Sequence, residues 1–204
     1  MHIVDGALAD SVVIGGAVLA VAGISYGLRR MDLERIPQMG VLTAAFFIAS
    51  LIHVPVGPTS LHLILNGLIG LALGWAAFPV LFVALILQAV FFGYGGLIVL
   101  GVNTLNIALP GVIAWLLIEK RVLINPPQQA AIWGGIAGAL SILLTATMVS
   151  ISLALSGEAF VAAAKLVLWS HIPLMVIEAL VTAAAVFLLT KVKPDFFVNR
   201  VVPQ

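Results

Sequence analysis

Residues 129–155, "QAAIWGGIAGALSILLTATMVSISLAL", decide the fold class because they run without a single charged side chain. A helix needs about 17–25 apolar residues to cross the roughly 30 Å hydrocarbon core of a bilayer, so this stretch predicts a transmembrane helix. The rest of the chain has the same character. Of its 204 residues, 63% are hydrophobic and only 8% are charged, which no water-soluble domain could bury. We therefore predict a multi-pass protein embedded in the lipid bilayer.

Six further apolar segments indicate that the whole chain, residues 1–204, is one membrane domain. We predict an all-α protein of seven transmembrane helices within residues 8–190, an N-terminal segment at 1–7 and a tail at 191–204. The fifth span is short, and glycines at 93, 95 and 96 are expected to bend or break the fourth. The predicted spans are 8–28, 37–54, 60–77, 80–100, 105–118, 129–155 and 170–190.

The basic residues orient this bundle. Seven spans place the termini on opposite sides of the membrane, and eight of the nine Lys and Arg residues then fall on one side, with only Lys165 on the other. Because cations collect in cytoplasmic loops, we predict an external N-terminus and a cytoplasmic C-terminal tail. The eight residues are Arg29, Arg30, Arg35, Lys120, Arg121, Lys191, Lys193 and Arg200.

This orientation places all four histidines, His2, His53, His62 and His171, at or near the external side. His2 is chemically distinctive, because the terminal amine, the residue-2 amide nitrogen and Nδ1 of its ring can chelate one ion in a plane. One further imidazole would complete four planar nitrogens, which is diagnostic of Ni(II) or Cu(II). The alternative is an ordinary exposed histidine near the N-terminus.

The stretch "HVPVGPTSLHLILNGLIG", residues 53–70, supplies a candidate for that imidazole. Its prolines predict an external turn, after which Thr59 or Ser60 would cap a helix with His62 in the first turn. Asn66 would then lie one turn below His62 on the same face. We expect His53 to pack at the interface, and His171 to begin the last helix after a Ser170 cap.

Glu178 is expected to lie inside the membrane, where a carboxylate must be paired or functional. Candidate partners are Gln88 and Ser or Thr hydroxyls on facing helices. We expect a structural hydrogen-bonding role, with proton relay as the alternative.

Four separated motifs resemble the nickel/cobalt substrate-capture subunits of energy-coupling factor transporters, the CbiM/NikM family. They are "MHIVDG" (1–6), "GPTSLHLILNGLIGLALG" (57–74), "LILQAVFFGYGGLIVLGVNTLNIALPG" (85–111) and "HIPLMVIEALVTA" (171–183). The resemblance covers nearly the whole chain and implies a six-helix core with one added N-terminal helix. It also implies a metal site made by the amine of Met1, the backbone nitrogen and ring of His2, and His62.

The wording "TSLHLILNG" resembles the nickel-type branch of that family, so Ni²⁺ is the favoured substrate and Co²⁺ the alternative; no cofactor is expected. We expect Asp5 and Ser60 to orient the imidazoles from outside the ligand set, because such partners typically matter 10–100-fold. Asn66 and Asn103 are further candidates for that surrounding layer.

The resemblance implies ATP-driven uptake across a bacterial or archaeal inner membrane. No G-x-x-x-x-G-K-[ST] loop is present, so ATP would be bound by two separate ATPase subunits, joined through a transmembrane scaffold subunit. Any small accessory membrane protein is expected to be a separate chain. Small residues spaced by four, Gly40 with Ala44 and Ala45 with Ala49, predict a scaffold-docking face; packing within the bundle is the alternative.

Other function classes fit less well. The net charge is +1 without a basic run, which gives no sign of nucleic-acid binding, and the absence of cysteine excludes thiolate chemistry. An intramembrane zinc protease would need an H-E-x-x-H pair, which the sequence lacks. An ion-coupled secondary carrier would use Glu178, but such carriers usually show internal repeats, and none is visible.

Overall fold

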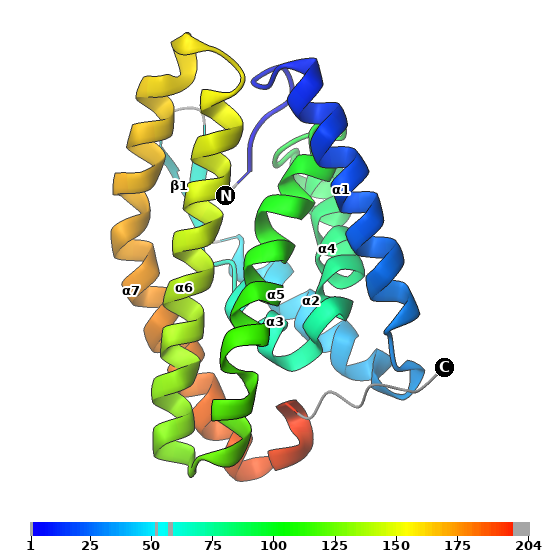
Figure 1. The fold of residues 1–204 in the computed structure, drawn as a ribbon, viewed down its shortest axis with the longest axis vertical. Helices are drawn as coiled ribbons and strands as arrows, with labels where there is room; N and C mark the ends of the chain where they lie inside the picture. Colours follow the sequence, from blue (N-terminus) through cyan, green and yellow to red (C-terminus); the bar gives the residue numbers. More distant parts are fainter. Residues whose placement is uncertain (1, 52, 57–58, 198–204) are drawn as a thin grey trace.

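The computed structural model describes residues 2–51, 53–56 and 59–197 of the chain. They form a helical bundle with one short hairpin, shown in Figure 1. The α-helices are α1 (Asp10–Arg29), α2 (Ile36–Ala49), α3 (Asn66–Leu73), α4 (Ala77–Phe92), α5 (Leu100–Ile124), α6 (Pro127–Ala154) and α7 (Val161–Val192). The hairpin strands are β1 (His53–Val56) and β2 (Thr59–His62), and the 3₁₀ turns are η1 (Leu33–Arg35), η2 (Gly74–Ala76), η3 (Glu158–Phe160) and η4 (Pro194–Phe197).

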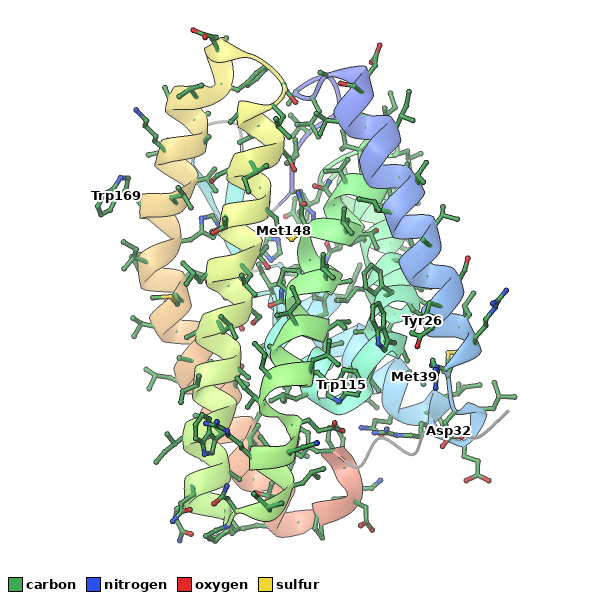
Figure 2. All side chains as sticks on the ribbon, viewed as in Figure 1. Tyr26, Asp32, Met39, Trp115, Met148 and Trp169 are labelled. Atoms are coloured by element: carbon green, nitrogen blue, oxygen red, sulfur yellow. The ribbon has the colours of Figure 1, made fainter. Side chains whose placement is uncertain are left out.

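The described helices have the composition of a multi-pass membrane protein. By length and hydropathy, four segments in the described part of the chain can cross a membrane: Asp10–Arg29, Asn66–Phe92, Pro127–Ala154 and Glu158–Val192. Large apolar side chains also cover the outside of the bundle, and Figure 2 shows Trp169 projecting away from it. The predicted class, an α-helical multi-pass membrane protein, is confirmed.

Helix α5 lies at the centre of the packing. It contacts α1, α3, α4 and α6, whereas α7 packs mainly on α6 and α2 mainly on α4. Figure 1 accordingly shows α1 and α7 on opposite flanks of the molecule, with the other helices between them.

Close approach of α3 to α5 fixes the position of the short helix α3. The side-chain amide of Asn66 donates to the carbonyl of Ile107 at 2.9 Å. One turn further along, a Cβ at Gly70 would lie only 2.1 Å from the carbonyl oxygen of Gly111, so the crossing requires glycine. At Gly74 the backbone enters the left-handed region, φ +54°, and α3 ends.

The second and third spans were predicted wrongly as continuous helices, 37–54 and 60–77. In the structure α2 ends at Ala49, and an antiparallel hairpin pairs His53 with His62 before α3 begins at Asn66. Strand pairing within the hairpin lets backbone hydrogen bonds form inside the protein, which is where non-helical backbone is tolerated at membrane depth.

Three other boundaries differ from the prediction. Helix α4 ends at Phe92, because Gly93 takes φ +66°, so the predicted break at these glycines is real. Helix α5 begins at Leu100, five residues before the predicted start at 105. Helix α7 begins at Val161, so Ser170 lies inside the helix and is not its cap.

Candidate metal site

The N-terminal segment folds back into the bundle instead of lying on its outer surface. Figure 1 shows the segment that precedes α1 turning back from the start of that helix toward α6. His2 is 3% exposed and Ile3 is 2% exposed. His2 is therefore enclosed by protein, and the alternative of an ordinary exposed histidine is wrong.

Two side chains hold this segment in place, one from α5 and one from the segment itself. Asn103 of α5 accepts a hydrogen bond from the Ile3 amide and donates one to the Ile3 carbonyl, both at 3.0 Å. Asp5 accepts a hydrogen bond from the Val99 amide at 3.1 Å. Asn103 and Asp5, both candidates from the sequence, therefore position the segment that carries His2.

The glycines between α4 and α5 have a role that the sequence analysis missed. A Cβ at Gly96 would lie 2.0 Å from Cγ of Asp5, and one at Gly95 would lie 3.2 Å from Cβ of His2. The loop thus passes directly against the N-terminal segment. The signal was present in "GYGG", which predicted a bend but not what the bend accommodates.

His2 and His62 meet inside the protein. Their Nε2 atoms are 3.2 Å apart, and their rings stack with centroids 4.8 Å apart and planes 26° from parallel. His62 is 2% exposed. The predicted pair is therefore brought together, although His62 lies at the end of β2 and not in the first turn of a helix.

Hydrogen bonding fixes which nitrogen of His62 can bind a metal. Its Nδ1 lies 2.8 Å from the carbonyl oxygen of Leu63, and a carbonyl only accepts, so Nδ1 carries the hydrogen. Nε2 of His62 then holds a lone pair and faces His2. In the neutral pair, His2 donates from Nε2, which leaves the lone pair of His2 on Nδ1. This is the nitrogen that can close a chelate ring with the residue-2 amide.

The surroundings of the two rings are aromatic. Phe46 meets the His62 ring edge-on at 6.4 Å, and Tyr94 stacks with the His2 ring at 6.1 Å. Within residues 2–51, 53–56 and 59–197, no three His, Cys, Asp or Glu side chains gather into one group. What the described residues offer is a pair of imidazole nitrogens beside backbone nitrogens, a donor set that suits nickel, copper or cobalt more than calcium or magnesium.

Of the other predicted site residues, some lie away from the two histidine rings and some lie outside the described part of the chain. Met1 lies outside the described residues, as does the side chain of Ser60. Asn66 is buried, but its amide bonds the Ile107 carbonyl and the Thr145 hydroxyl, each at 2.9 Å, so it ties α3 to α5 and α6. The prediction that it shares a helix face with His62 was wrong, because His62 is not helical.

His171 does not begin the last helix, whereas Glu178 makes hydrogen bonds as expected but with other partners. His171 lies in the middle of α7, and its Nδ1 bonds the Val167 carbonyl at 2.5 Å. Glu178 accepts hydrogen bonds from the backbone amides of Ile64 and Leu65. Gln88, its predicted partner, bonds the hydroxyl of Ser50 at 2.7 Å instead.

On α2, the predicted docking residues divide into two pairs. Gly40 and Ala44 are exposed, and nothing lies within 4 Å of a Cβ built at Gly40. Ala45 and Ala49 are partly buried, on the sides of the helix nearer the bundle. The outward pair therefore forms the more accessible part of the predicted surface.

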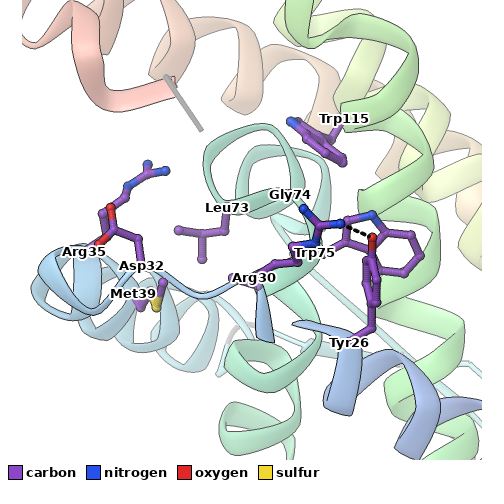
Figure 3. Close-up of a pocket in the computed structure, with 10 residues that line it drawn as sticks. Tyr26, Arg30, Asp32, Arg35, Met39, Leu73, Gly74, Trp75 and Trp115 are labelled. Atoms are coloured by element: carbon purple, nitrogen blue, oxygen red, sulfur yellow. Dashed lines mark hydrogen bonds between the residues drawn. The ribbon is translucent and has the colours of Figure 1, made fainter. Parts of the chain in front are cut away.

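A cavity of about 150 Å³ lies beside the C-terminal end of α1 and is shown in Figure 3. Two guanidinium groups line it, and Arg30 donates to the Tyr26 hydroxyl at 3.0 Å, the dashed line in Figure 3. One carboxylate, that of Asp32, also lines the cavity, and the two guanidinium groups leave its lining with a net positive charge, which disfavours a metal cation.

Comparison with known proteins identifies the chain. Residues 2–196 match the CbiM family, described as the cobalt uptake substrate-specific transmembrane region. The chain belongs to the CbiM family. This CbiM protein is 43% identical over 197 residues to a metal transport protein of Haemophilus influenzae, and the match covers 96% of both chains.

Two further comparisons extend this result. The CbiM protein is 29% identical over 211 residues to a fused nickel transport protein, NikMN, of Archaeoglobus fulgidus, covering 100% of this chain and 70% of the relative. The crystal structure of a truncated transition metal transporter matches its fold with a TM-score of 0.77 at 24% identity, covering 94% of this chain and 99% of the other. The chain is a membrane protein of cobalt and nickel transport, not an enzyme.

Proposed function

We propose that this CbiM protein captures Ni²⁺, with Co²⁺ as the alternative substrate, and delivers it for ATP-driven uptake. The ligands would be the amine of Met1, the backbone nitrogen and ring Nδ1 of His2, and Nε2 of His62. The observation that carries the proposal is the buried approach of the two imidazoles, with Nε2 atoms 3.2 Å apart. This approach brings the two rings close enough together for one ion to bind both.

The metal-bound arrangement requires local rearrangement of His2, because Nδ1, not Nε2, closes the six-membered ring with its own amide. His62 needs less change, since the Leu63 carbonyl already leaves Nε2 as the ligating nitrogen. Four nitrogens in a plane favour Ni(II) and Cu(II) over metals that prefer oxygen. In this proposal Asn103 and Asp5 hold the segment while the ion binds.

Energy would come from partner subunits. Two ATPases and a transmembrane scaffold fit a chain without a P-loop sequence. Support comes from relatives described as fused proteins, among them a cobalt transport protein, CbiMQ, of Methanocorpusculum labreanum, 27% identical over 218 residues and covering 98% of this chain and 36% of the relative. These names belong to the relatives, and the complex is a proposal for this chain.

The proposed orientation keeps the N-terminus outside the cell membrane and the C-terminal tail in the cytoplasm. In Figure 1 the end of α1, the α5–α6 connection and the end of α7 lie at the same end of the bundle, and these segments carry most of the cations. The positive-inside rule would place that end in the cytoplasm.

Metal binding tests the site directly. We expect the purified wild-type protein, loaded with Ni²⁺ and desalted, to retain about one ion per chain by mass spectrometry, and His62→Ala to lose it. His171→Ala removes another buried imidazole and is the matched control, expected to bind within a few-fold of wild type. Loss in the control with retention in His62→Ala would refute the site.

The exposed pair on α2 provides the test of scaffold docking. Transmembrane helices pack closely through small residues. A tryptophan at Ala44 would therefore hold α2 away from a helix of the proposed scaffold. Ala44→Trp should abolish co-purification with the scaffold while Ni²⁺ binding persists, whereas Ala22→Trp on the exposed face of α1 should change neither. Loss of both properties in Ala44→Trp would show that this face is internal.

A further inference from the structure

Glu178 is fully buried in the middle of α7, on the inward face that also carries Leu174 and Thr182. Its carboxylate binds two consecutive backbone amides of another part of the chain. Oε1 accepts from the Ile64 amide, and the Leu65 amide lies 3.0 Å from Oε1 and 3.2 Å from Oε2. A buried carboxylate with such specific partners calls for an account beyond packing.

The bonded amides belong to the link between β2 and α3. Residues 63–65 are neither strand nor helix, and Leu65 has φ +53°, the one non-glycine residue with positive φ in the described part of the chain. That conformation costs about 1–2 kcal/mol for a residue with a Cβ. Buried amides also need partners, and two neighbouring N–H groups directed at one carboxylate provide them. Glu178 therefore holds the link in an otherwise unfavourable conformation.

The same link touches the metal site through a single peptide group. The Leu63 carbonyl and the Ile64 amide belong to one planar peptide, with oxygen and hydrogen on opposite sides. Glu178 accepts from the amide side, and Nδ1 of His62 donates to the carbonyl side at 2.8 Å. An ordered chain therefore runs from the carboxylate, through one peptide, to the imidazole that faces His2.

We propose that Glu178 is a positioning residue for the metal site, holding the Leu63–Ile64 peptide so that its carbonyl fixes the tautomer and direction of the His62 ring. The carboxylate also polarises the peptide, which strengthens the carbonyl as an acceptor. Partners that bind the far nitrogen of a ligating histidine set its orientation and basicity. This role rests on the proposed function, because it requires that His62 bind the ion.

Glu178→Gln tests the role with little change in volume. The glutamine oxygen can replace Oε1, but it carries no charge, and its NH₂ group cannot accept from the Leu65 amide as Oε2 does. The peptide is therefore held and polarised less strongly. We expect Ni²⁺ affinity to fall about 10–100-fold. We also expect the visible absorption of the bound Ni²⁺ to move to longer wavelength, as water replaces imidazole in the fourth position. Thr182→Val, one turn along the same buried face, should keep wild-type affinity and spectrum.

A double variant separates positioning from general folding. If Glu178 acts through His62, adding Glu178→Gln to His62→Ala should cause no further loss of affinity in the monodisperse protein. Glu178→Asp keeps the charge but shortens the side chain. It should shift the absorption in the same direction as Glu178→Gln, by a smaller amount. This variant replaces Glu178→Gln in the test if the glutamine variant does not fold.

The variants distinguish a failure of the positioning role from a failure of the proposed function. An unchanged spectrum and affinity in Glu178→Gln, with His62→Ala defective, would overturn the positioning role alone. So would an equal loss from Glu178→Gln in the wild-type and His62→Ala backgrounds. Wild-type affinity in His62→Ala would instead refute the proposed function.

Discussion

At the scale of single residues, Asn103 has the most specific contact in the N-terminal region. Its side-chain oxygen and nitrogen match the amide and carbonyl of Ile3, each at 3.0 Å, in a buried environment. A side-chain amide is the one uncharged group that can both accept and donate in this way. Asn103 thus fixes the backbone of the residue that follows His2.

Asn103→Ala should therefore weaken Ni²⁺ binding by about 10–100-fold, because the segment that carries His2 loses its two hydrogen bonds to Asn103. The measurement is calorimetric titration of the purified protein with Ni²⁺. Asn106→Ala is the control: Asn106 lies on the same helix and is as deeply buried, but it bonds Ser152. Equal losses in the two variants would show that burial, not the contact with Ile3, matters.

The proposed ligands also predict how binding depends on pH. A free imidazole is protonated below about pH 6.5 and a terminal amine below about pH 8, and each must lose its proton to bind metal. Affinity should therefore fall as the pH falls, by more than tenfold per unit below about pH 6.5, since several protons compete with one ion. Equilibrium dialysis from pH 5 to pH 8 measures this, and a flat profile would exclude amine and imidazole ligands.

How well single residues could be predicted depended on whether the prediction used chemistry and family resemblance or helical spacing. The pairing of His2 with His62 came from family resemblance and chelate chemistry, and the structure brings these residues together. The placement of Asn66 relied on helical spacing and was wrong once His62 proved to lie in a strand. The partners of Glu178 could not be predicted, because backbone amides of an irregular link leave no mark in a sequence.

At the scale of elements, the hairpin is where the sequence was least informative. A short apolar run fits a buried strand as well as a buried helix, and periodicity alone does not distinguish the two. Pro55 and Pro58 signalled a turn, but the residues on either side were apolar enough to be assigned to transmembrane helices. The other helices were found because they are long, and length is the stronger signal, although α5 and α7 begin earlier and α4 ends earlier than predicted.

The crossing of α3 and α5 yields a stability prediction. Gly70→Ala would place a methyl group 2.1 Å from the Gly111 carbonyl oxygen, so the helices must separate. Overpacking of this kind typically costs about 1–3 kcal/mol, and we expect a clearly lower unfolding temperature in detergent. Gly15→Ala, where nothing lies within 4 Å of the new methyl group, should be neutral or slightly stabilising. Equal unfolding temperatures for the two variants would contradict the described crossing.

At the scale of the whole molecule, composition was enough to predict a multi-pass helical protein. The burial of His2 was not predictable, because the N-terminal segment folds back among helices that are far away in the sequence. Asn103 is a hundred residues from Ile3, and no local pattern reports such a contact. The place of the N-terminal segment against α5 therefore had to come from the structure.

An N-terminal extension tests this dependence on the complete transporter. Adding one alanine before Met1 keeps every side chain but moves the amine away from the His2 ring. The new terminus can fill all four planar positions by itself, which would displace His62. We expect the extension, or acetylation, to abolish Ni²⁺ uptake by cells, and a C-terminal tag to leave uptake intact. Mass spectrometry of the N-terminus is the control, and full uptake by a verified extended chain would refute amine ligation.

The burial of His2 has a kinetic consequence. The residue is only 3% exposed, so an ion that binds to His2 as proposed would reach it only when the N-terminal segment opens. The observed binding rate would then level off at high nickel concentration, at the opening rate of the segment. Release would have the same limit. A strong chelator in solution would remove the ion no faster than the segment opens, so a bound ion would stay long enough for transport.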